Sequence, residues 1–455
     1  MTETELLKKI DSTAAAEIFS RLYGAREIDA ACLRYRTLIT EMLKSGPDSF
    51  DETGHSETDD LRVFSAPGRT ELGGNHTDHN RGRVLAASIQ LDSAAIVRKR
   101  KDNIAFFRST GYPDVKVKLT DPSGAPDLQP KPEEEGTTEA LIRGIAAEFS
   151  RRGCTVGGFS ANADSTVLPG SGLSSSAALE VLIGRIFDSL YGEGKLSALK
   201  IAQIGQIAEN VYFGKPCGLM DQTACAAGGA VAIDFADAAL PVVKQINFDL
   251  AAAGYALCVV NTGGNHADLT ADYASIPSEM KAAAAFFGKS VLRELEKETF
   301  LARASEVRKA LGDRAFLRSL HFFDENNRVA AMTGALVKNE NAGTAAEKQS
   351  AVIDYLRLVN ESGDSSWQLL QNVYSPHHPE NQGIGAALAL TKDFFQKQKL
   401  YGACRVHGGG FAGTIQAYIP LDALDAYRAN IETVFGADSV TVLQIRPQGA
   451  IEIFF

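Results

Sequence analysis

The chain has 455 residues, a length that predicts two domains with an additional extension. Hydrophobic residues make up 45% of it and charged residues 22%, which is typical of a folded globular enzyme. The net charge of -10 argues against nucleic acid as the main partner, because phosphate backbones bind basic surfaces. A small anionic ligand, which needs only a local site, is compatible with this charge.

The cysteines and the N-terminal sequence bear on the cellular compartment. Six cysteines are scattered without a CxxC pair, which favours free thiols in a reducing compartment. The first residues contain no apolar signal core, and no stretch approaches the roughly 18 to 20 apolar residues of a membrane span. We therefore expect a cytoplasmic protein without a membrane partner.

The predicted elements begin with helix. Apolar residues from Leu6 to Leu22 recur at steps of three and four, so residues 3–44 are expected to be helical. Residues 45–60 contain six acidic side chains and are expected to form an exposed linker. The stretch VLAASIQLDSAAIVRKR, residues 84–100, predicts a strand, a turn and a second strand. Further predicted elements are helices over 137–153 and 198–214, and a strand, glycine turn and long helix over 157–192.

The second half of the chain mixes strands and helices. Strands are expected at GGAVAIDF and YALCVVNT, and the sequence DYASIPSEMKAAAAFFG is expected to be helical. Further helices are predicted around 301–311, 327–340, 346–361 and 382–396, and strands near 412–419 and 440–455. Because strands do not alternate regularly with helices, the predicted class is α+β with segregated, partly antiparallel sheets.

The stretch PGSGLSSSAALE, residues 169–180, has the composition of a phosphate-binding turn. Its glycines allow a tight turn, and three consecutive serines stand where a helix is expected to begin. A helix N-terminus offers free N–H groups and the positive end of the helix dipole, which favour phosphate, and serine hydroxyls can bind Mg²⁺. A serine-rich helix cap is the alternative interpretation, and the GK[ST] of a Walker A loop is absent.

Two carboxylates stand in the stretch AENVYFGKPCGLMDQTA, residues 208–224. Glu209 lies on a predicted helix, and Asp221 follows a glycine turn beside apolar neighbours. An acid among apolar residues is costly to bury unpaired, so Asp221 either caps a helix or is held for chemistry. In phosphoryl transfer, one carboxylate can accept the proton of the attacking hydroxyl while another binds the metal.

Two further stretches are rich in glycine. RTELGGNHTDHNRG, residues 69–82, combines many polar groups with three glycines, which does not suit a core strand. RVHGGGFAGTIQAYI, residues 405–419, places a triple glycine before an alternating strand. The triple glycine suits a close approach to a ligand or to another loop, and a plain tight turn is the alternative.

Taken in their order along the chain, the four stretches resemble the motifs of the GHMP kinase superfamily and, within it, of the galactokinase family. APGRTELGGNHTDHNRG is similar to the first motif, whose usual form is GRxNxIGEHxDYxxG. PGSGLSSSAALE is similar to the second motif, the phosphate loop, and RVHGGGFAG is similar to the third. GKPCGLMDQ resembles the segment with the catalytic aspartate, and NHADLTADY, residues 265–273, resembles a further sugar-site segment.

The resemblance implies a two-domain fold with the active site between the domains. An N-terminal ribosomal-S5-like domain would span 62–245 and a C-terminal ferredoxin-like domain 246–455, after a helical extension and acidic linker over 1–61. The implied reaction is ATP-dependent phosphorylation of the anomeric C1 hydroxyl of galactose or a close relative, with ATP and Mg²⁺ as cofactors.

The resemblance also assigns roles by position. Asp221 would accept the proton of the sugar hydroxyl, and Arg69 would stabilise charge on the transferring phosphoryl group. Ser176 and Glu209 would bind Mg²⁺. The implied sugar-binding positions are Asn75, His76, Thr77, Asp78, Gly218 and Tyr273. The implied ATP-binding positions are Gly170, Ser171, Gly172, Leu173, Ser174, Ser175 and Ser176, with Gly408, Gly409 and Gly410 near the site.

The first motif departs from the family pattern. Glu71 stands where the family has Asn, and Asn75 stands where the family has a Glu that it uses near the C6 hydroxyl of the sugar. An amide can donate as well as accept a hydrogen bond, and it carries no charge. Two hypotheses follow: the sugar differs from galactose at C6, or the pocket is retuned for galactose itself. The alternative substrates are galacturonate, N-acetylgalactosamine or another galactose-like sugar.

Two questions stay open at the level of sequence. A sensor that binds sugar and ATP without turnover is a second class of function, disfavoured because Asp221, Arg69, Glu209 and the serine loop are intact. The extension could cover the N-terminal domain or form a subunit contact, and the chain could be a monomer or a weak dimer.

Overall fold

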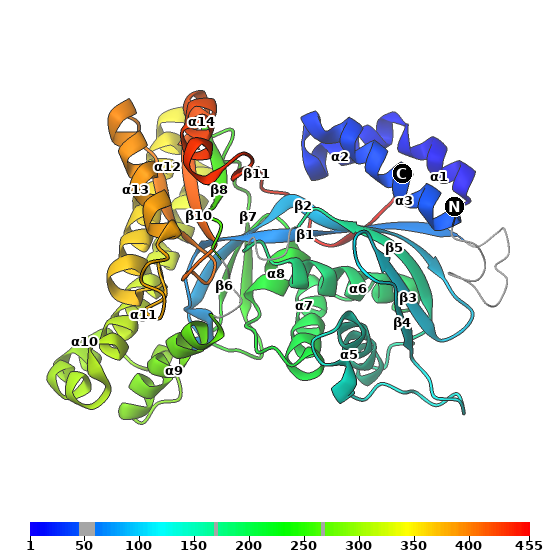
Figure 1. The fold of residues 1–455 in the computed structure, drawn as a ribbon, viewed down its shortest axis with the longest axis horizontal. Helices are drawn as coiled ribbons and strands as arrows, with labels where there is room; N and C mark the ends of the chain where they lie inside the picture. Colours follow the sequence, from blue (N-terminus) through cyan, green and yellow to red (C-terminus); the bar gives the residue numbers. More distant parts are fainter. Residues whose placement is uncertain (45–59, 168–171, 265–268) are drawn as a thin grey trace.

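The computed structural model describes residues 1–44, 60–167, 172–264 and 269–455, and its strands form two sheets (Figure 1). The first sheet has the order β12-β1-β2-β5-β3-β4, and β6 and β7 join it along the first residues of β2. Its strands are β1 (Leu61–Gly73), β2 (Arg83–Lys99), β3 (Ile104–Ser109), β4 (Val115–Lys118), β5 (Phe159–Ser165), β6 (Ala230–Asp234), β7 (Val242–Ile246) and β12 (Ile451–Ile453).

Strand β2 runs unbroken through the residues where the sequence predicted a turn. Asp92 stands within this strand opposite Pro67 of β1, and its side chain is fully buried. The carboxylate pairs with Arg34 at 2.5 Å and with Arg446 at 3.2 Å, and it accepts a hydrogen bond from Tyr23 at 2.7 Å. The predicted turn was wrong because partners distant in sequence balance a charge that the local pattern marks as exposed.

Four helices and a π-helical turn cover one face of the first sheet. Aromatic residues such as Phe149, Phe159 and Phe187 fill the core between the sheet and these helices. The covering elements are α5 (Thr138–Arg151), α6 (Ser175–Tyr191), α7 (Ala198–Ile207), the π-helical turn (Ala208–Phe213) and α8 (Met220–Ala227).

The N-terminal region forms three helices rather than the single one predicted, and they cover the opposite face of the sheet (Figure 1). Ser12 caps the second helix, and Gly24 ends it at a φ of 94°, so two short breaks divide the predicted helix. Phe19 and Tyr35 stack at 5.1 Å and belong to a core cluster with strands β1, β2 and β12. The helices are α1 (Glu3–Ile10), α2 (Thr13–Tyr23) and α3 (Ile28–Lys44).

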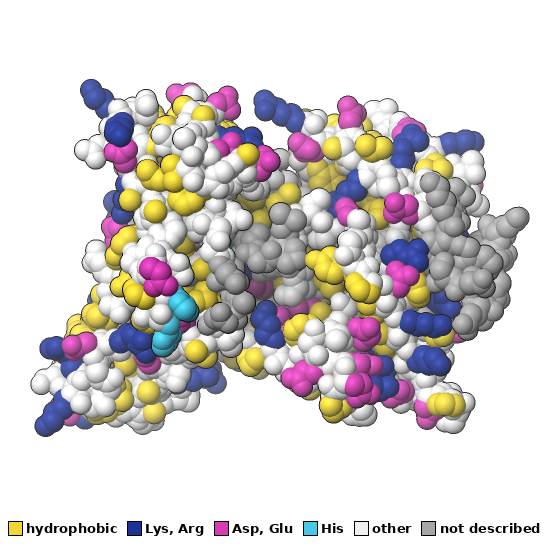
Figure 2. All heavy atoms as spheres, viewed as in Figure 1, with side chains coloured by type: hydrophobic (Ala, Val, Ile, Leu, Met, Phe, Trp, Pro, Cys, Tyr) yellow, Lys and Arg dark blue, Asp and Glu magenta, His cyan; other side chains and the backbone are white. Residues whose placement is uncertain are grey.

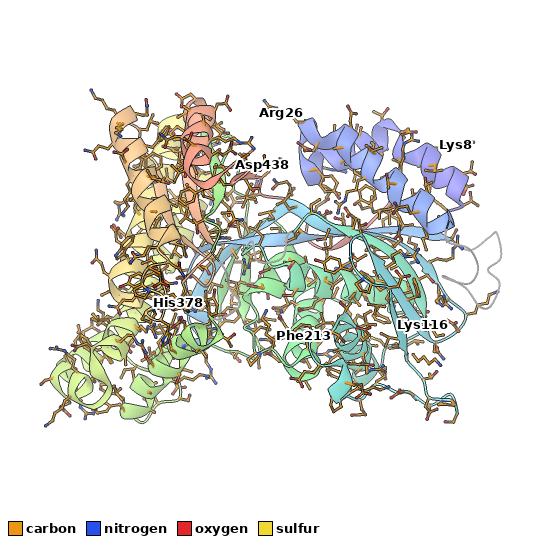
Figure 3. All side chains as sticks on the ribbon, in the orientation of Figure 1. Lys8, Arg26, Lys116, Phe213, His378 and Asp438 are labelled. Atoms are coloured by element: carbon orange, nitrogen blue, oxygen red, sulfur yellow. The ribbon has the colours of Figure 1, made fainter. Side chains whose placement is uncertain are left out.

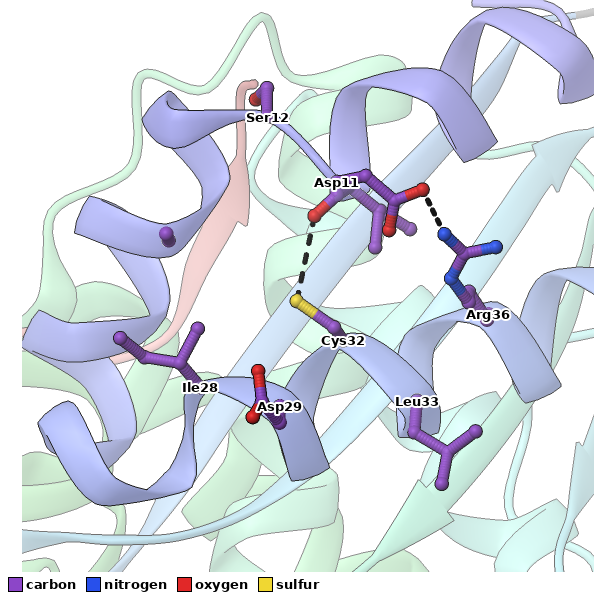
Figure 4. A pocket seen from close by; sticks show the side chains of 9 residues that line it. Asp11, Ser12, Ile28, Asp29, Cys32, Leu33 and Arg36 are labelled. Atoms are coloured by element: carbon purple, nitrogen blue, oxygen red, sulfur yellow. Dashed lines mark hydrogen bonds and ion pairs between the residues drawn. The ribbon is translucent and has the colours of Figure 1, made fainter.

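The outer side of this extension faces solvent. Lys8 and Arg26 are exposed there and point away from the sheet (Figure 3). A groove of about 360 Å³ opens between the helices, with Cys32 and Leu33 among its lining residues (Figure 4). No residue of the predicted site lines this groove. The extension thus covers the first sheet, which was one of the two expected roles.

The second sheet has the order β11-β8-β10-β9, and all of its pairs are antiparallel. Helices α11 and α12 pack on one face of it, and α13 and α14 on the other. Helix α11 also contacts strands β1 and β2, which joins the two halves of the molecule. The elements are β8 (Tyr255–Asn261), α9 (Thr270–Phe286), α10 (Lys297–Ala302), α11 (Ala304–Asn341), α12 (Ala345–Ser365), α13 (Gly383–Gln398), β9 (Ala403–His407), β10 (Thr414–Pro420), α14 (Leu424–Phe435) and β11 (Val440–Leu443).

The end of the chain returns to the first sheet. Strand β12 pairs with β1 through Ile451, Glu452 and Ile453, beside the N-terminal helices. Lys9 donates a hydrogen bond of 2.7 Å to the backbone carbonyl of Phe455. The domain division at residues 245 and 246 stays a prediction, and the last strand belongs to the sheet of the preceding half.

The surface carries both signs of charge. In Figure 2, Lys and Arg side chains are interspersed with Asp and Glu side chains over both halves of the visible face. Within the parts of the chain that the structure describes, we find no helix with the length and apolar character needed to cross a membrane.

Candidate active site

The predicted site segments meet where the two halves of the molecule join. The loop after β1, residues 74–80, hydrogen-bonds to the loop after β9 and to helix α11. The N-termini of α6 and α8 face β1 from the first half. Gly170, Ser171 and residues 265–268 lie outside the described residues, and their assigned roles stay predictions.

Asp221 lies in the first turn of α8 and faces Arg69 of β1. The Nε and Nη2 atoms of Arg69 each donate a hydrogen bond of 2.8 Å to a different carboxylate oxygen of Asp221. Ser174, which precedes α6 with a left-handed φ of 60°, donates its hydroxyl to the same carboxylate and does not cap the helix. Three motifs that are distant in the sequence therefore converge on one carboxylate.

The surrounding charges favour the ionised form of this carboxylate. Burial alone would raise the pKa of Asp221, but the guanidinium of Arg69 and the hydroxyl of Ser174 lower it below its usual value. Burial opposes the charge of Arg69 as well, and the carboxylate nonetheless raises the pKa of the guanidinium. Because 33% of the Asp221 side chain is exposed, an ionised oxygen is available to a hydroxyl group that enters the site.

A second carboxylate, Glu209, lies close to the N-terminus of α6. Its Oε1 atom is 3.3 Å from Oγ of Ser176 and 3.2 Å from Nζ of Lys215. Gln222 donates hydrogen bonds of 2.9 Å to both Glu209 and Glu180. Burial and the charge of Glu209 raise the pKa of Glu180 well above its usual value, which favours the neutral form of Glu180.

The oxygen donors of Ser176 and Glu209 suit a hard cation. Mg²⁺ keeps several waters and takes one or two carboxylates from the protein together with phosphate oxygens from a nucleotide. A hydroxyl and a carboxylate beside a helix N-terminus therefore fit Mg²⁺ bound to a nucleotide. Over the described residues, no three His, Cys, Asp or Glu side chains cluster as a metal site made by the protein alone.

The triple glycine after β9 lies against the loop that follows β1. The three successive carbonyl oxygens of residues 408–410 accept hydrogen bonds from Asn75 at 2.7 Å, His76 at 2.9 Å and Tyr273 at 3.0 Å, in that order. The first and third of these glycines have φ of 65° and 80°. A Cβ on the middle one would lie 2.4 Å from the ring of Tyr273, so only glycine fits. The triple glycine therefore lies close to another loop, and its approach to a ligand stays a prediction.

His76 is neutral in this arrangement. Burial lowers the pKa of its imidazole to about 4, against the opposite effect of the hydrogen bond with the carbonyl of Gly409. Because a carbonyl oxygen can only accept, Nε2 of His76 carries the proton and donates it. The ring can therefore hold the glycine loop without introducing a buried charge.

Asp78 lies directly against Gly218. A Cβ built on Gly218 would stand 2.0 Å from Oδ2 of Asp78, closer than atoms can approach. The other oxygen, Oδ1, accepts the backbone N–H of His79 at 2.9 Å. The segment with Gly218 and the loop with Asp78 thus meet at this point, and the Asp78 carboxylate occupies the space that a side chain at position 218 would fill.

We expect Gly218→Ala to raise the KM for the sugar at least about ten-fold, because the added methyl displaces the Asp78 carboxylate. The KM for ATP should change little. The measurement is steady-state kinetics with each substrate varied in turn. Gly334→Ala is the matched control, since nothing lies within 4 Å of a Cβ at that position of α11. Equal kinetics for both variants would contradict the assignment of Asp78 and Gly218.

Two of the predicted sugar-binding residues direct their side chains to protein groups. Asn75 is 1% exposed, and besides the glycine carbonyl its amide contacts Glu71 at 3.1 Å and Asn372 at 2.8 Å. Thr77 is fully buried, and its hydroxyl lies 2.9 Å from the carbonyl of Gly74 in its own loop and 2.6 Å from that of Arg83 at the start of β2. Sugar contacts by these two side chains stay predictions, and this arrangement argues against them.

Several residues that hold the site were missed at the sequence level. Arg405 has no exposed side-chain surface and pairs with Glu71. From helix α11, Glu325 accepts a backbone N–H of the 74–80 loop at 3.0 Å, and His321 donates to a carbonyl of that loop at 2.9 Å. The only available signal was the arginine inside the third motif, which follows the apolar residues Ala403 and Cys404.

Comparisons with known proteins agree with this geometry. A family model described as the GHMP kinases N terminal domain matches residues 140–229, and one described as the galactokinase galactose-binding signature matches residues 48–99. A galactokinase of Streptomyces coelicolor is 32% identical over 380 residues, which cover 82% of this chain and 89% of the relative. A galactokinase of Glaesserella parasuis is 31% identical over 370 residues, which cover 80% of this chain and 86% of the relative.

Solved structures with a similar fold include a galactokinase and a mevalonate kinase. The crystal structure of a Lactococcus lactis galactokinase complexed with galactose matches with a TM-score of 0.72 at 24% identity, covering 91% of this chain and 100% of that chain. A mevalonate kinase matches with a TM-score of 0.56 at 12% identity, over 84% of this chain and 98% of that chain. The predicted α+β class is confirmed, and the fold is that of the GHMP kinases. Within this class, the chain belongs to the galactokinase family.

Proposed function

We propose that this protein transfers a phosphoryl group from ATP to the anomeric C1 hydroxyl of galactose, releasing galactose 1-phosphate and ADP. The observation that carries the proposal is the bidentate pair of Asp221 and Arg69 at the N-terminus of α8, beside the N-terminus of α6. Membership of the galactokinase family supports galactose as the acceptor and does not favour the other sugars or a sensor without turnover.

The charges of the pair fit the two halves of the reaction. Asp221, ionised and partly exposed, is the group that accepts the proton of the C1 hydroxyl while the oxygen of that hydroxyl attacks phosphorus. Arg69 keeps its positive charge and stabilises the negative charge of the transferring group. Phosphoryl transfer depends mainly on alignment and charge stabilisation, which this site supplies.

The remaining residues bind and orient the two substrates. The free N–H groups at the start of α6 suit the phosphates of ATP. Ser176 and Glu209 would hold Mg²⁺, which when bound neutralises charge on the phosphates. His76, Asp78 and Tyr273 surround the place for the sugar. We further propose that the protein acts in the cytoplasm, which detection in the cytosolic fraction of cells would test.

A substrate panel tests the proposed function directly. Purified protein is assayed for ADP release with galactose, galacturonate, N-acetylgalactosamine and arabinose, and the product is identified by phosphorus NMR. We expect kcat/KM for galactose to exceed the others by at least about ten-fold, since a missing or changed polar group leaves site groups unpaired. A higher kcat/KM for galacturonate would overturn galactose as the acceptor, and binding without ADP release would support the sensor.

Glu209→Gln should raise the Mg²⁺ concentration for half-maximal activity by at least about ten-fold, because the amide carries no charge for the cation. Titration of activity with Mg²⁺ at fixed ATP measures the change. Glu180→Gln is the matched control, since it contacts the same Gln222 and its carboxyl favours the neutral form. An equal Mg²⁺ requirement in the two variants would count against Glu209 as a ligand.

A further inference from the structure

Residues 71 and 75 carry the acid and the amide in the reverse order from the family pattern, and in the structure they touch. Nδ2 of Asn75 donates a hydrogen bond of 3.1 Å to Oε1 of Glu71. Arg405, which is completely buried, pairs with the same carboxylate oxygen. The pair therefore keeps one carboxylate and one amide, and the charge at position 71 has its own buried counter-charge.

The amide at position 75 makes contacts that a carboxylate cannot make. Its second N–H donates to the carbonyl of Gly408 at 2.7 Å. Its Oδ1 accepts from Asn372 at 2.8 Å, and the same Asn372 amide donates to the carbonyl of Gly409 at 3.1 Å. A carboxylate at position 75 would oppose acceptor to acceptor at both Gly408 and Glu71. Both donor hydrogens of the amide are thus used, and none is left for a sugar hydroxyl.

The loop that Asn75 holds also holds two predicted sugar-binding side chains. His76 donates to the next carbonyl of the triple glycine, and Tyr273 donates to the one after it. Phe411, which follows, has a left-handed φ of 61° and packs edge-on against Tyr273 with ring centres 5.5 Å apart. The position of the 408–410 loop therefore sets the position of both side chains.

We propose that Asn75 is a positioning residue that does not contact the sugar: its amide fixes the 408–410 loop, and the loop fixes His76 and Tyr273. The reversed order of acid and amide at residues 71 and 75 then alters the contact with this loop, and it does not indicate a sugar that differs from galactose at C6. The kinetic test of this proposal rests on the proposed function, because it uses galactose as the substrate. The structural test needs only the hydrogen bonds.

The isosteric variant Asn75→Asp tests the proposal, because it exchanges the donor group for an acceptor and changes no volume. We expect kcat/KM for galactose to fall at least about ten-fold, mostly through a higher KM for galactose, with the KM for ATP almost unchanged. In Glu71→Gln/Asn75→Asp the contact between two carboxylates is removed, and part of the loss should return. Asn430→Asp, at an exposed position of α14, is the matched control for an added charge.

A second sugar separates positioning from contact. If Asn75 only positions the loop, Asn75→Asp lowers kcat/KM for galactose and for 6-deoxygalactose by the same factor. If Asn75 touches the C6 hydroxyl, the variant changes the preference between the two sugars, and the proposal is overturned. Wild-type kinetics in Asn75→Asp would overturn it as well.

Hydrogen exchange tests the proposal without any substrate. We expect faster amide exchange in a peptide covering residues 405–413 of Asn75→Asp than of the wild type, with Asn430→Asp unchanged. Unaltered exchange would contradict the proposal even if galactose is the substrate. If the wild type does not phosphorylate galactose, the proposed function fails, and the exchange experiment still decides the role of Asn75.

Discussion

Asp221→Asn should lower kcat by about 10²- to 10⁴-fold while galactose binding stays nearly intact, because an amide cannot take the proton of the C1 hydroxyl. The substitution also removes the charge that pairs with both donor atoms of Arg69. Turnover is measured by ADP release, and sugar binding by calorimetry in the absence of ATP. Activity within ten-fold of the wild type would remove Asp221 from the role of base.

Ser174→Ala is the matched control for this variant. It deletes one hydroxyl that donates to Asp221 and leaves the carboxylate and Arg69 in place. We expect a loss in kcat of no more than about ten-fold, the value of one hydrogen bond. The pH dependence has a definite sign: the pKa of Asp221 is lowered, so its contribution to kcat/KM is lost only as pH falls below the usual carboxyl range.

Asp92→Asn should destabilise the protein by about 3–5 kcal/mol, because it leaves the fully buried guanidinium of Arg446 without its counter-charge and leaves Arg34 with Asp164 alone. Arg446 has no exposed side-chain surface, and that of Arg34 is 15% exposed. The free energy of unfolding in urea measures the loss. A change below about 1 kcal/mol, the size of a surface ion pair, would show that the network contributes little.

Asp164→Asn is the matched control, because it removes another carboxylate that pairs with Arg34 and leaves Asp92 in place. Asp164 contacts the same guanidinium at 2.7 Å, but its side chain is 27% exposed, so we expect a cost of about 0–1 kcal/mol. Burial alone would raise the pKa of Asp92, and Arg34 and Arg446 lower it below its usual value. Its stabilising effect is therefore complete above the usual carboxyl range and is lost as pH falls through the lowered pKa.

Local sequence patterns predicted the class of the fold and the segments of the site. Glycines before a run of serines, and an acid after a glycine turn, have few uses in a core, so they marked functional loops. The β2 strand was misread because Asp92 and Ser93 are typical turn residues, and the burial of Asp92 depends on Arg34 and Arg446 from the two ends of the chain. The three N-terminal helices were merged because a short break leaves the apolar periodicity almost unchanged.

The role of Asn75 could not be predicted from its residue type. Its sequence position pointed to the sugar, and its amide chemistry suggested a different sugar at C6. The structure surrounds the same amide with Glu71, Gly408 and Asn372, which are 4, 333 and 297 residues away in the chain. No local pattern carries the contacts with Gly408 and Asn372, since they exist only after the two halves of the molecule have packed.

The residue types at the site follow from sequence, because phosphoryl transfer needs a carboxylate, a cation and free N–H groups, and few side chains supply them. The pairing of those residues follows from tertiary structure alone. Asp221 and Arg69 are 152 residues apart, and folding brings them to 2.8 Å in a partly buried site where each stabilises the charge of the other. The protonation states, the route of the glycine loop and the place of the last strand depend on that packing.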